Sequence, residues 1–162
     1  MRVLGIDPGY GIVGYGLIDA NTTTQVVDYG VVSTPKELSL PERLEIIYSS
    51  IESLINSYKP DVVAVEELFY FKNQTTVIPV AEARGVILLA CRKNKVKLYE
   101  YTPLQIKQAL TGVGRAEKAQ IQFMVKTILG LEKVPKPDDA ADALAVAICH
   151  SQINPNLNQN YV

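Results

Sequence analysis

The sequence predicts an α/β fold in which a mixed five-stranded sheet is flanked by helices on both faces. Short runs of apolar and β-branched residues alternate with segments whose apolar residues recur at helical spacing. These segments follow one another in the order β-β-β-α-β-α-β-α, with further helical pattern near the end. With 162 residues, 48% of them hydrophobic and 20% charged, the chain suits a single soluble globular domain.

The N-terminal half is expected to contribute four of the five strands. They are predicted at residues 2–7, 12–19, 25–33 and 62–66. A turn at 19–22 makes 12–33 a hairpin. A helix is predicted over 41–58, because Pro41 suits a first helical turn and apolar residues from Leu44 to Ile55 form one stripe.

The C-terminal half is expected to be mostly helical. A polar and aromatic loop is predicted at 69–76, a strand at 96–101, a stiff linker at 133–137, and helices at 77–92, 103–111, 117–129 and 138–151. The helix 77–92 is apolar nearly all round, so it is either the central core helix or meets another subunit. We expect one domain over 1–151 and a disordered Asn- and Gln-rich tail over 152–162.

This order of elements is an RNase H-like layout, and it brings two carboxylates together. Asp7 ends the first apolar run and Glu66 ends the fourth. If these strands are parallel neighbours joined through a helix, the two acids lie side by side. Glu67 makes the second assignment ambiguous, because strand alternation sends Glu66 and Glu67 to opposite faces.

A second acidic pair, Asp139 and Asp142, opens the last helix. Residues three apart share a helix face, so these side chains can point the same way. Capping of the helix by Asp138 or Asp139 is an alternative, although a cap does not explain Asp142. Hard oxygen donors without a His or Cys cluster suggest Mg²⁺ or Mn²⁺. Together the four acids indicate metal-dependent phosphodiester chemistry.

Charge is unevenly distributed along a chain whose net charge is −1. The segment 72–136 holds 12 of the 16 Lys and Arg but 4 of the 17 Asp and Glu, so it carries +8 against −9 elsewhere. A basic surface beside an acidic site suits a polyanion, although solvated helix faces would give the same count. The lack of a membrane span, signal peptide or cysteine framework predicts a cytoplasmic protein.

Two nucleotide-binding alternatives fit poorly. Residues 9–14 satisfy the GxGxxG pattern of dinucleotide sites, but that loop must open a helix and residues 12–19 indicate a strand. We expect the glycines instead to make the turn after Asp7 and to let a bulky backbone approach. An ATPase of the actin and Hsp70 type also begins with such a strand and loop, but it needs two such domains, for which the chain is too short.

Five motifs, in order across residues 2–150, resemble the bacterial RuvC family of Holliday-junction resolvases. They are Gly5-Ile-Asp-Pro-Gly9, Val65-Glu66, Ala83-Arg84-Gly85, Gly114-Arg-Ala-Glu-Lys118 and Asp139-Ala-Ala-Asp142-Ala-Leu-Ala. The resemblance aligns Asp139 rather than Asp138. Two features depart from the family pattern: the tail is not basic, and Arg115 stands where a small residue is common.

The resemblance implies a Mg²⁺-dependent endonuclease that resolves four-way DNA junctions in recombination and repair. Asp7, Glu66, Asp139 and Asp142 would be the catalytic acids and hold two Mg²⁺ or Mn²⁺ ions. A homodimer would nick two opposed strands and work with the RuvA and RuvB motor. The expected DNA contacts are Phe69, Lys72, Asn73, Lys107, Arg115 and Lys118.

Two other functions remain open on the residues alone. The same acids would serve an RNase H-like nuclease with another substrate, such as RNA–DNA hybrids, and a non-cleaving junction-binding module would share the fold. No His or Cys nucleophile is required for this chemistry. The only histidine, His150, lies two turns below Asp142 and is expected to be structural.

Overall fold

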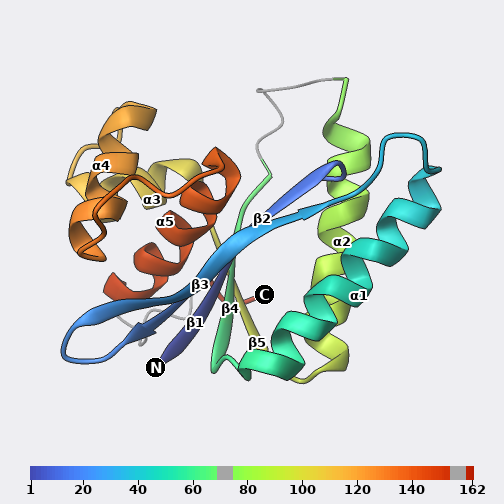
Figure 1. Ribbon diagram of the computed structural model, residues 1–162, viewed down its shortest axis with the longest axis horizontal. Coiled ribbons are helices and arrows are strands. Elements are labelled where there is room, and N and C mark those ends of the chain that lie inside the picture. Colours follow the sequence, from blue (N-terminus) through green and yellow to red (C-terminus); the bar gives the residue numbers. More distant parts are fainter. Residues whose placement is uncertain (69–74, 154–159) are drawn as a thin grey trace.

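A twisted five-stranded sheet lies between two groups of helices in the computed structural model (Figure 1). The structure describes residues 1–68, 75–153 and 160–162. The strands are β1 (Arg2–Asp7), β2 (Ile12–Ala20), β3 (Thr24–Ser33), β4 (Val62–Glu66) and β5 (Lys97–Tyr101). The helices are α1 (Leu40–Tyr58), α2 (Val77–Lys93), α3 (Pro103–Thr111), α4 (Lys118–Ile128) and α5 (Asp138–Gln152). The predicted mixed α/β architecture is confirmed.

The sheet has the strand order β3-β2-β1-β4-β5. The hairpin β2–β3 is antiparallel and β2 runs antiparallel to β1, whereas β1, β4 and β5 are parallel to one another. In the β1–β4 pair, Ile6 is opposite Val65. Asp7 and Glu66 each follow this last pair by one residue, so they end neighbouring strands at the same edge of the sheet, as expected.

Each face of the sheet is covered by its own helices (Figure 1). One apolar cluster joins alternate strand residues to α1 and α2, and the other joins the remaining strand residues to α3, α4 and α5. The alternation of side chains along a strand allows both clusters to be filled. Because both faces are buried, β1 and β4 are almost continuously apolar.

The central core helix is α5, not α2. Ten consecutive or near-consecutive residues of α5 are buried, and its interior carries no charged side chain after Asp142. By contrast, α2 packs against α1 on the outside of the molecule and leaves Ile78 and Leu89 exposed. An ion pair between Arg84 of α2 and Glu100 of β5 joins this helix to the sheet. Both helices are apolar, so composition alone did not distinguish them.

Glycines bring α5 into direct contact with the two strands beneath it. A Cβ atom added to Gly5 would lie 2.1 Å from the carbonyl oxygen of Ala143, and one added to Gly14 would lie 2.0 Å from that of Asp139. Real Cβ atoms do not come this close to backbone oxygen, so the helix can rest here only on glycine. The sequence predicts that a bulky backbone approaches the glycines of residues 9–14, and at Gly14 the backbone that approaches is the first turn of α5.

The chain end differs from the expected disordered tail in its last residues. Residues 154–159 lie outside the described residues, but Tyr161 forms an antiparallel bridge with Tyr99 on the free edge of β5. The Val162 N–H donates to the carbonyl of Leu98 at 3.1 Å, and the Asn160 amide donates to the carbonyl of Glu100 at 2.8 Å. These residues therefore extend the sheet by a short segment.

Membrane-spanning potential is lacking in the helices that the structure describes: none combines the length and the apolar character that a bilayer crossing requires.

Candidate active site

A cavity of about 400 Å³ lies where β1, β4 and α5 meet. Asp7, Glu66 and Asp142 line it, although they come from three separate parts of the sequence. The first two are placed by the ends of parallel strands, and the third by the close packing of α5 on β1 and β2. Three of the four predicted acids therefore share one cavity.

Asp7 is the most perturbed of these acids. Burial raises its pKa to about 8, and the nearby charges of Glu66, Asp142 and Asp139 raise it in the same direction. Lys118 opposes this shift only weakly. A carboxylate surrounded by three others costs free energy when ionised, unless a cation lies among them. The electrostatics of this cavity therefore favour the binding of a cation.

Asp139 contributes charge without lining the cavity. It lies in the first turn of α5, half-buried, and its backbone carbonyl packs over Gly14. Its negative charge nevertheless reaches Asp7. Neither Asp138 nor Asp139 is the helix cap: Pro137 has that position, and its carbonyl accepts the N–H of Ala140. Capping therefore does not account for the acidic pair.

Lys118 provides the positive charge found beside the acids. Its ammonium group donates to an Asp142 carboxylate oxygen at 3.2 Å, and it lies 3.5 Å from Asp138. Burial would lower the pKa of Lys118, but the charges and hydrogen bonds of Asp142 and Asp138 raise it. Burial also keeps the pKa of Asp142 above its ordinary value despite this contact. Lys107 lines the same cavity from α3.

The four acids are chemically suited to bind hard divalent cations, although their side chains are not arranged as a complete set of metal ligands. Within residues 1–68, 75–153 and 160–162, no group of three or more His, Cys, Asp or Glu side chains is arranged to hold a metal ion. Like-charged carboxylates repel one another, and Lys118 already pairs with Asp142. Carboxylate oxygens are the ligands that Mg²⁺ and Mn²⁺ prefer. The donor set fits such ions. Their positive charge would offset the repulsion between carboxylates that helps to raise the pKa of Asp7.

Comparison with known proteins identifies the family of this chain. Residues 3–150 match the family model described as "Crossover junction endodeoxyribonuclease RuvC". The chain belongs to the RuvC family. It is 60% identical over 151 residues to the RuvC of Fusobacterium nucleatum, covering 93% of this chain and 80% of that protein. The RuvC of Caldicellulosiruptor saccharolyticus is 56% identical over 152 residues, covering 93% and 92%.

A solved structure supports the same assignment for the fold. "T. thermophilus RuvC in complex with Holliday junction substrate" superimposes with a TM-score of 0.89 at 36% identity, covering 94% of this chain and 93% of that one. The expected RNase H-like fold is thus shared with a RuvC endonuclease. Three of the five motifs that carry the RuvC resemblance contribute an acid to the cavity: Asp7 from the first, Glu66 from the second and Asp142 from the last.

The predicted DNA contacts of this RuvC family member fall into three groups. Lys107 and Lys118 lie in the cavity. Arg115 is exposed in the connection before α4 and is not among the cavity-lining residues. Phe69, Lys72 and Asn73 lie outside the described residues.

Several features of the cavity were not predicted for this RuvC chain. Glu67, the first residue after β4, lines it beside Glu66. The backbone N–H of Glu67 donates to the carbonyl of Tyr101, the last residue of β5. The apolar wall comes from Val77, Val80, Ile106 and Ile121. Only their tertiary placement reveals it, because these residues look like ordinary core positions in the sequence.

His150 is structural, as expected. It is buried, and its Nδ1 shares a hydrogen bond of 2.7 Å with the hydroxyl of Tyr101. Burial lowers the pKa of the imidazole. Tyr99 packs against the ring with a centroid distance of 4.7 Å. These contacts lie between α5 and β5, and His150 does not line the cavity.

Proposed function

We propose that this protein cuts four-way DNA junctions as a metal-dependent endonuclease of the RuvC family. The observation that carries the proposal is the cavity in which Asp7, Glu66 and Asp142 meet two lysines. Acids that hold cations and lysines that face a phosphate are the two parts that phosphodiester hydrolysis requires. The substrate comes from the solved Thermus thermophilus relative, whose title describes a complex with a Holliday junction.

In this proposal Asp7, Glu66, Asp139 and Asp142 hold two Mg²⁺ or Mn²⁺ ions. When bound, such ions activate water for attack on phosphorus and stabilise the departing 3′ oxygen, which leaves 5′-phosphate and 3′-hydroxyl ends. Asp7 is suited to this role because its buried carboxylate lies close to three other acids. The apolar wall formed by α2, α3 and α4 limits the access of bulk water and strengthens these electrostatic interactions.

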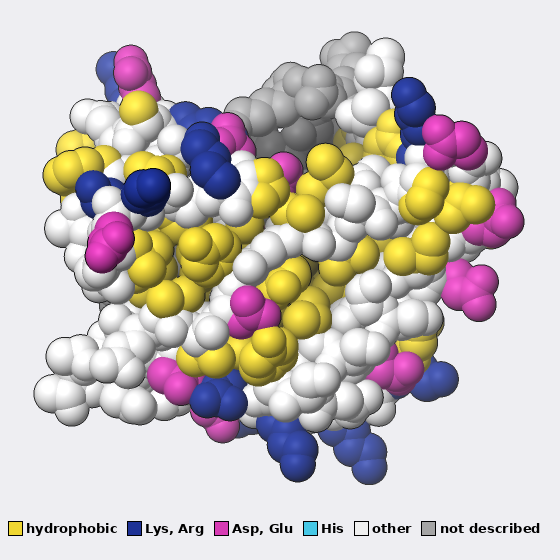
Figure 2. All heavy atoms as spheres, in the orientation of Figure 1, with side chains coloured by type: hydrophobic (Ala, Val, Ile, Leu, Met, Phe, Trp, Pro, Cys, Tyr) yellow, Lys and Arg dark blue, Asp and Glu magenta, His cyan; other side chains and the backbone are white. Residues whose placement is uncertain are grey.

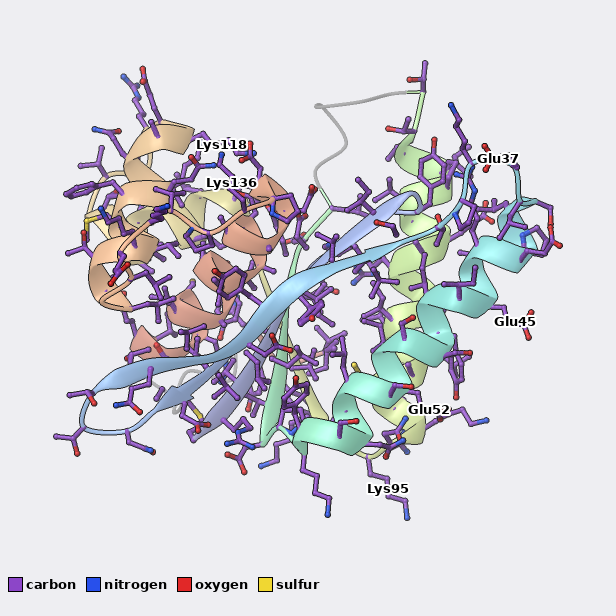
Figure 3. All side chains as sticks on the ribbon, viewed as in Figure 1. Glu37, Glu45, Glu52, Lys95, Lys118 and Lys136 are labelled. Carbon is purple, nitrogen blue, oxygen red and sulfur yellow. The ribbon has the colours of Figure 1, made fainter. Side chains whose placement is uncertain are left out.

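The lysines of the cavity act on the phosphate. Negative charge grows on the phosphoryl oxygens in the transition state, and Lys107 and Lys118 lie where they can offset it. Outside the cavity, basic side chains gather on the α3–α4 side of the molecule, whereas acids such as Glu37, Glu45 and Glu52 follow the α1 side (Figures 2 and 3). Arg115 belongs to the basic side, so this surface is the proposed DNA track.

A homodimer is proposed to form through the outer face of α2. Ile78 and Leu89 are exposed there, and between them Ala81 and Gly85 are also exposed. The four residues recur at helical spacing, and an exposed apolar stripe of this kind commonly marks an interface. A Cβ atom at Gly85 would meet nothing within 4 Å, so a second helix has room to approach. Two subunits would then nick opposed strands.

Two partners and a location complete the proposal. We propose cooperation with the RuvA and RuvB branch-migration motor, and membership of the RuvC family supports this expectation. The cytoplasm, where DNA is processed in bacteria, remains the predicted compartment.

The decisive experiment incubates purified protein with an end-labelled immobile four-way junction, with and without Mg²⁺. Symmetric nicking that requires Mg²⁺ is expected. Asp7→Asn should abolish cleavage while junction binding, measured by gel shift, persists. Glu45→Gln on the distant α1 makes the same charge change at an exposed position and should cleave normally.

The alternatives predict different results in the same assay. Cleavage of an RNA–DNA hybrid but not of the junction would indicate an RNase H-like nuclease with another substrate. Junction binding without cleavage under any metal condition would indicate a binding module. Full activity of Asp7→Asn would rule out the assigned acids.

A further inference from the structure

Asp138 lies beside the proposed metal ligands without being one of them. It is the first residue of α5, immediately before Asp139, and it does not line the cavity. Its carboxylate contacts two lysines: Lys136 at 2.8 Å and Lys118 at 3.5 Å. Figure 3 shows Lys118 and Lys136 close together above the start of α5, where the α4–α5 connection returns to the sheet.

Lys118 is shared between an outer and an inner carboxylate. The inner partner, Asp142, lines the cavity and its side chain is 30% exposed, whereas that of the outer partner, Asp138, is 46% exposed. Lys118 itself is 54% exposed, so its ammonium group is not locked by packing and can move between the two. The competition between these two carboxylates therefore determines how often Lys118 forms its ion pair with Asp142.

We propose that Asp138 is a positioning residue that holds Lys118 at the rim of the cavity and so keeps Asp142 available to a divalent cation. This inference rests on the proposed function of the cavity as a metal centre. Asp142 cannot direct the same oxygen fully to an ammonium group and to a divalent ion. When Lys118 moves away from Asp142, the carboxylate of Asp138 gives it a second partner. The ammonium group then stays at the rim of the cavity, where a DNA phosphate would bind.

Lys136 restricts the position of Asp138 in turn. Lys136 and Asp138 are separated by one residue, Pro137, whose ring limits the backbone between them. The short contact of 2.8 Å directs one carboxylate oxygen toward Lys136, and it is the other oxygen that faces Lys118. Asp138 is thereby oriented toward α4, so its effect should depend on Lys118 rather than on charge alone.

The test measures metal binding directly, with the full-length protein and no DNA. Mg²⁺ and Mn²⁺ are titrated separately while the melting temperature is followed, and the midpoint of each stabilisation curve is recorded. Asp138→Asn keeps the size of the side chain and removes its charge, so Lys118 should stay on Asp142 and the midpoint should rise about two- to five-fold, the range for a partly exposed ion pair. The Mg²⁺ midpoint for junction cleavage should rise in parallel.

Two matched variants separate positioning from long-range charge. Glu132→Gln removes one negative charge from the same α4–α5 connection, and Glu132 forms no ion pair among the residues that the structure describes. Its midpoint should match that of the parent. In a Lys118→Met background, Asp138→Asn should no longer change the midpoint, because the side chain through which Asp138 acts is gone.

The outcomes distinguish this proposal from the metal centre itself. An equal shift with and without Lys118 would overturn the positioning role and leave a simple effect of charge. A parent protein that responds to metal, together with an Asp138→Asn variant that responds identically, would overturn the positioning role alone. A parent protein that responds to neither metal would overturn both.

Discussion

Gly14 of β2 lies directly beneath the carbonyl of Asp139. A Cβ atom added to Gly14 would lie 2.0 Å from that carbonyl oxygen. The contact joins the centre of the sheet to the first turn of α5, which carries two of the proposed ligands. A glycine in the floor of the sheet therefore controls the height of the acidic helix above Asp7. The same helix rests on Gly5 farther along, so its whole axis is fixed by contacts between small residues and backbone.

Gly14→Ala should move this first turn and disrupt the site. Because the methyl group meets backbone atoms, we expect a loss of about 1–3 kcal/mol in the free energy of unfolding, as in other overpacked cores. Junction cleavage should fall at least ten-fold, and urea denaturation with cleavage kinetics would measure both. Gly11→Ala is the matched control, because a Cβ atom there meets nothing within 4 Å. A fully active Gly14→Ala variant would contradict this view of α5.

Asp7→Asn should stabilise the metal-free protein at high pH. The pKa of Asp7 is about 8 in the folded protein and near 3.8 when unfolded, so the folded state binds the proton more tightly. Stability from this group is present below pH 4 and is lost as pH rises toward about 8. The variant removes that loss, so its melting temperature in EDTA should exceed that of the parent by about 2 °C or more at pH 8.

The comparison at pH 4 supplies the control for that prediction. At pH 4 Asp7 is protonated in the folded protein and only about half ionised in the unfolded chain, so most of the advantage of Asn should disappear. Saturating Mg²⁺ should stabilise the parent at pH 8 more than it stabilises Asp7→Asn, because the variant lacks one of the proposed metal ligands. An advantage of Asn that is equal at both pH values would mean that packing, not ionisation, is responsible.

The sequence was sufficient to place Asp7 and Glu66 together, because their positions depend on local rules. Both end short apolar runs, and a right-handed crossover through α1 makes those runs parallel neighbours. The spacing of Asp139 and Asp142 predicted only that the two side chains share a helix face, whereas the place of Asp142 beside Asp7 depends on the packing of α5 on β1 and β2. The part of the site that depends on strand order alone was therefore predictable from the sequence.

The role of each apolar helix could not be predicted in the same way. α2 and α5 both lack a clear polar face, and the difference lies in their partners. Small residues of α5, such as Ala143 and Ala147, match Gly5 on a strand more than a hundred residues away. The ion pairs of Asp138 and the pairing of Tyr161 with Tyr99 likewise join distant or irregular segments, where no periodic pattern exists.

A charge on the outer face of α2 should separate the proposed dimer. Leu89 is 52% exposed, so Leu89→Glu should leave folding intact but place a carboxylate in the apolar stripe. Light scattering after gel filtration should show a monomer, and paired nicking of junctions should give way to single nicks. Phe123→Glu on α4 is the control, because Phe123 is 61% exposed on another helix and should remain dimeric. A dimeric Leu89→Glu variant would exclude the α2 interface.

Deletion of residues 160–162 should weaken the fold without impairing catalysis. The deletion removes the hydrogen bonds to Leu98 and Glu100 and the edge-to-face contact of Tyr161 with Tyr99, whose centroids are 5.4 Å apart. We expect the free energy of unfolding to fall by about 1–2 kcal/mol.

The free edge of β5 gives this deletion a second measurable effect. An uncovered edge strand pairs readily with another chain, so the truncated protein should also associate at high concentration. Lys97 remains to oppose this association but lies at the start of the strand. Tyr161→Ala keeps the backbone bridge, so it should lose stability without associating. Unchanged stability and solution behaviour after deletion would show that the terminal segment does not protect the sheet, whereas normal Mg²⁺-dependent cleavage would separate this role from the active site.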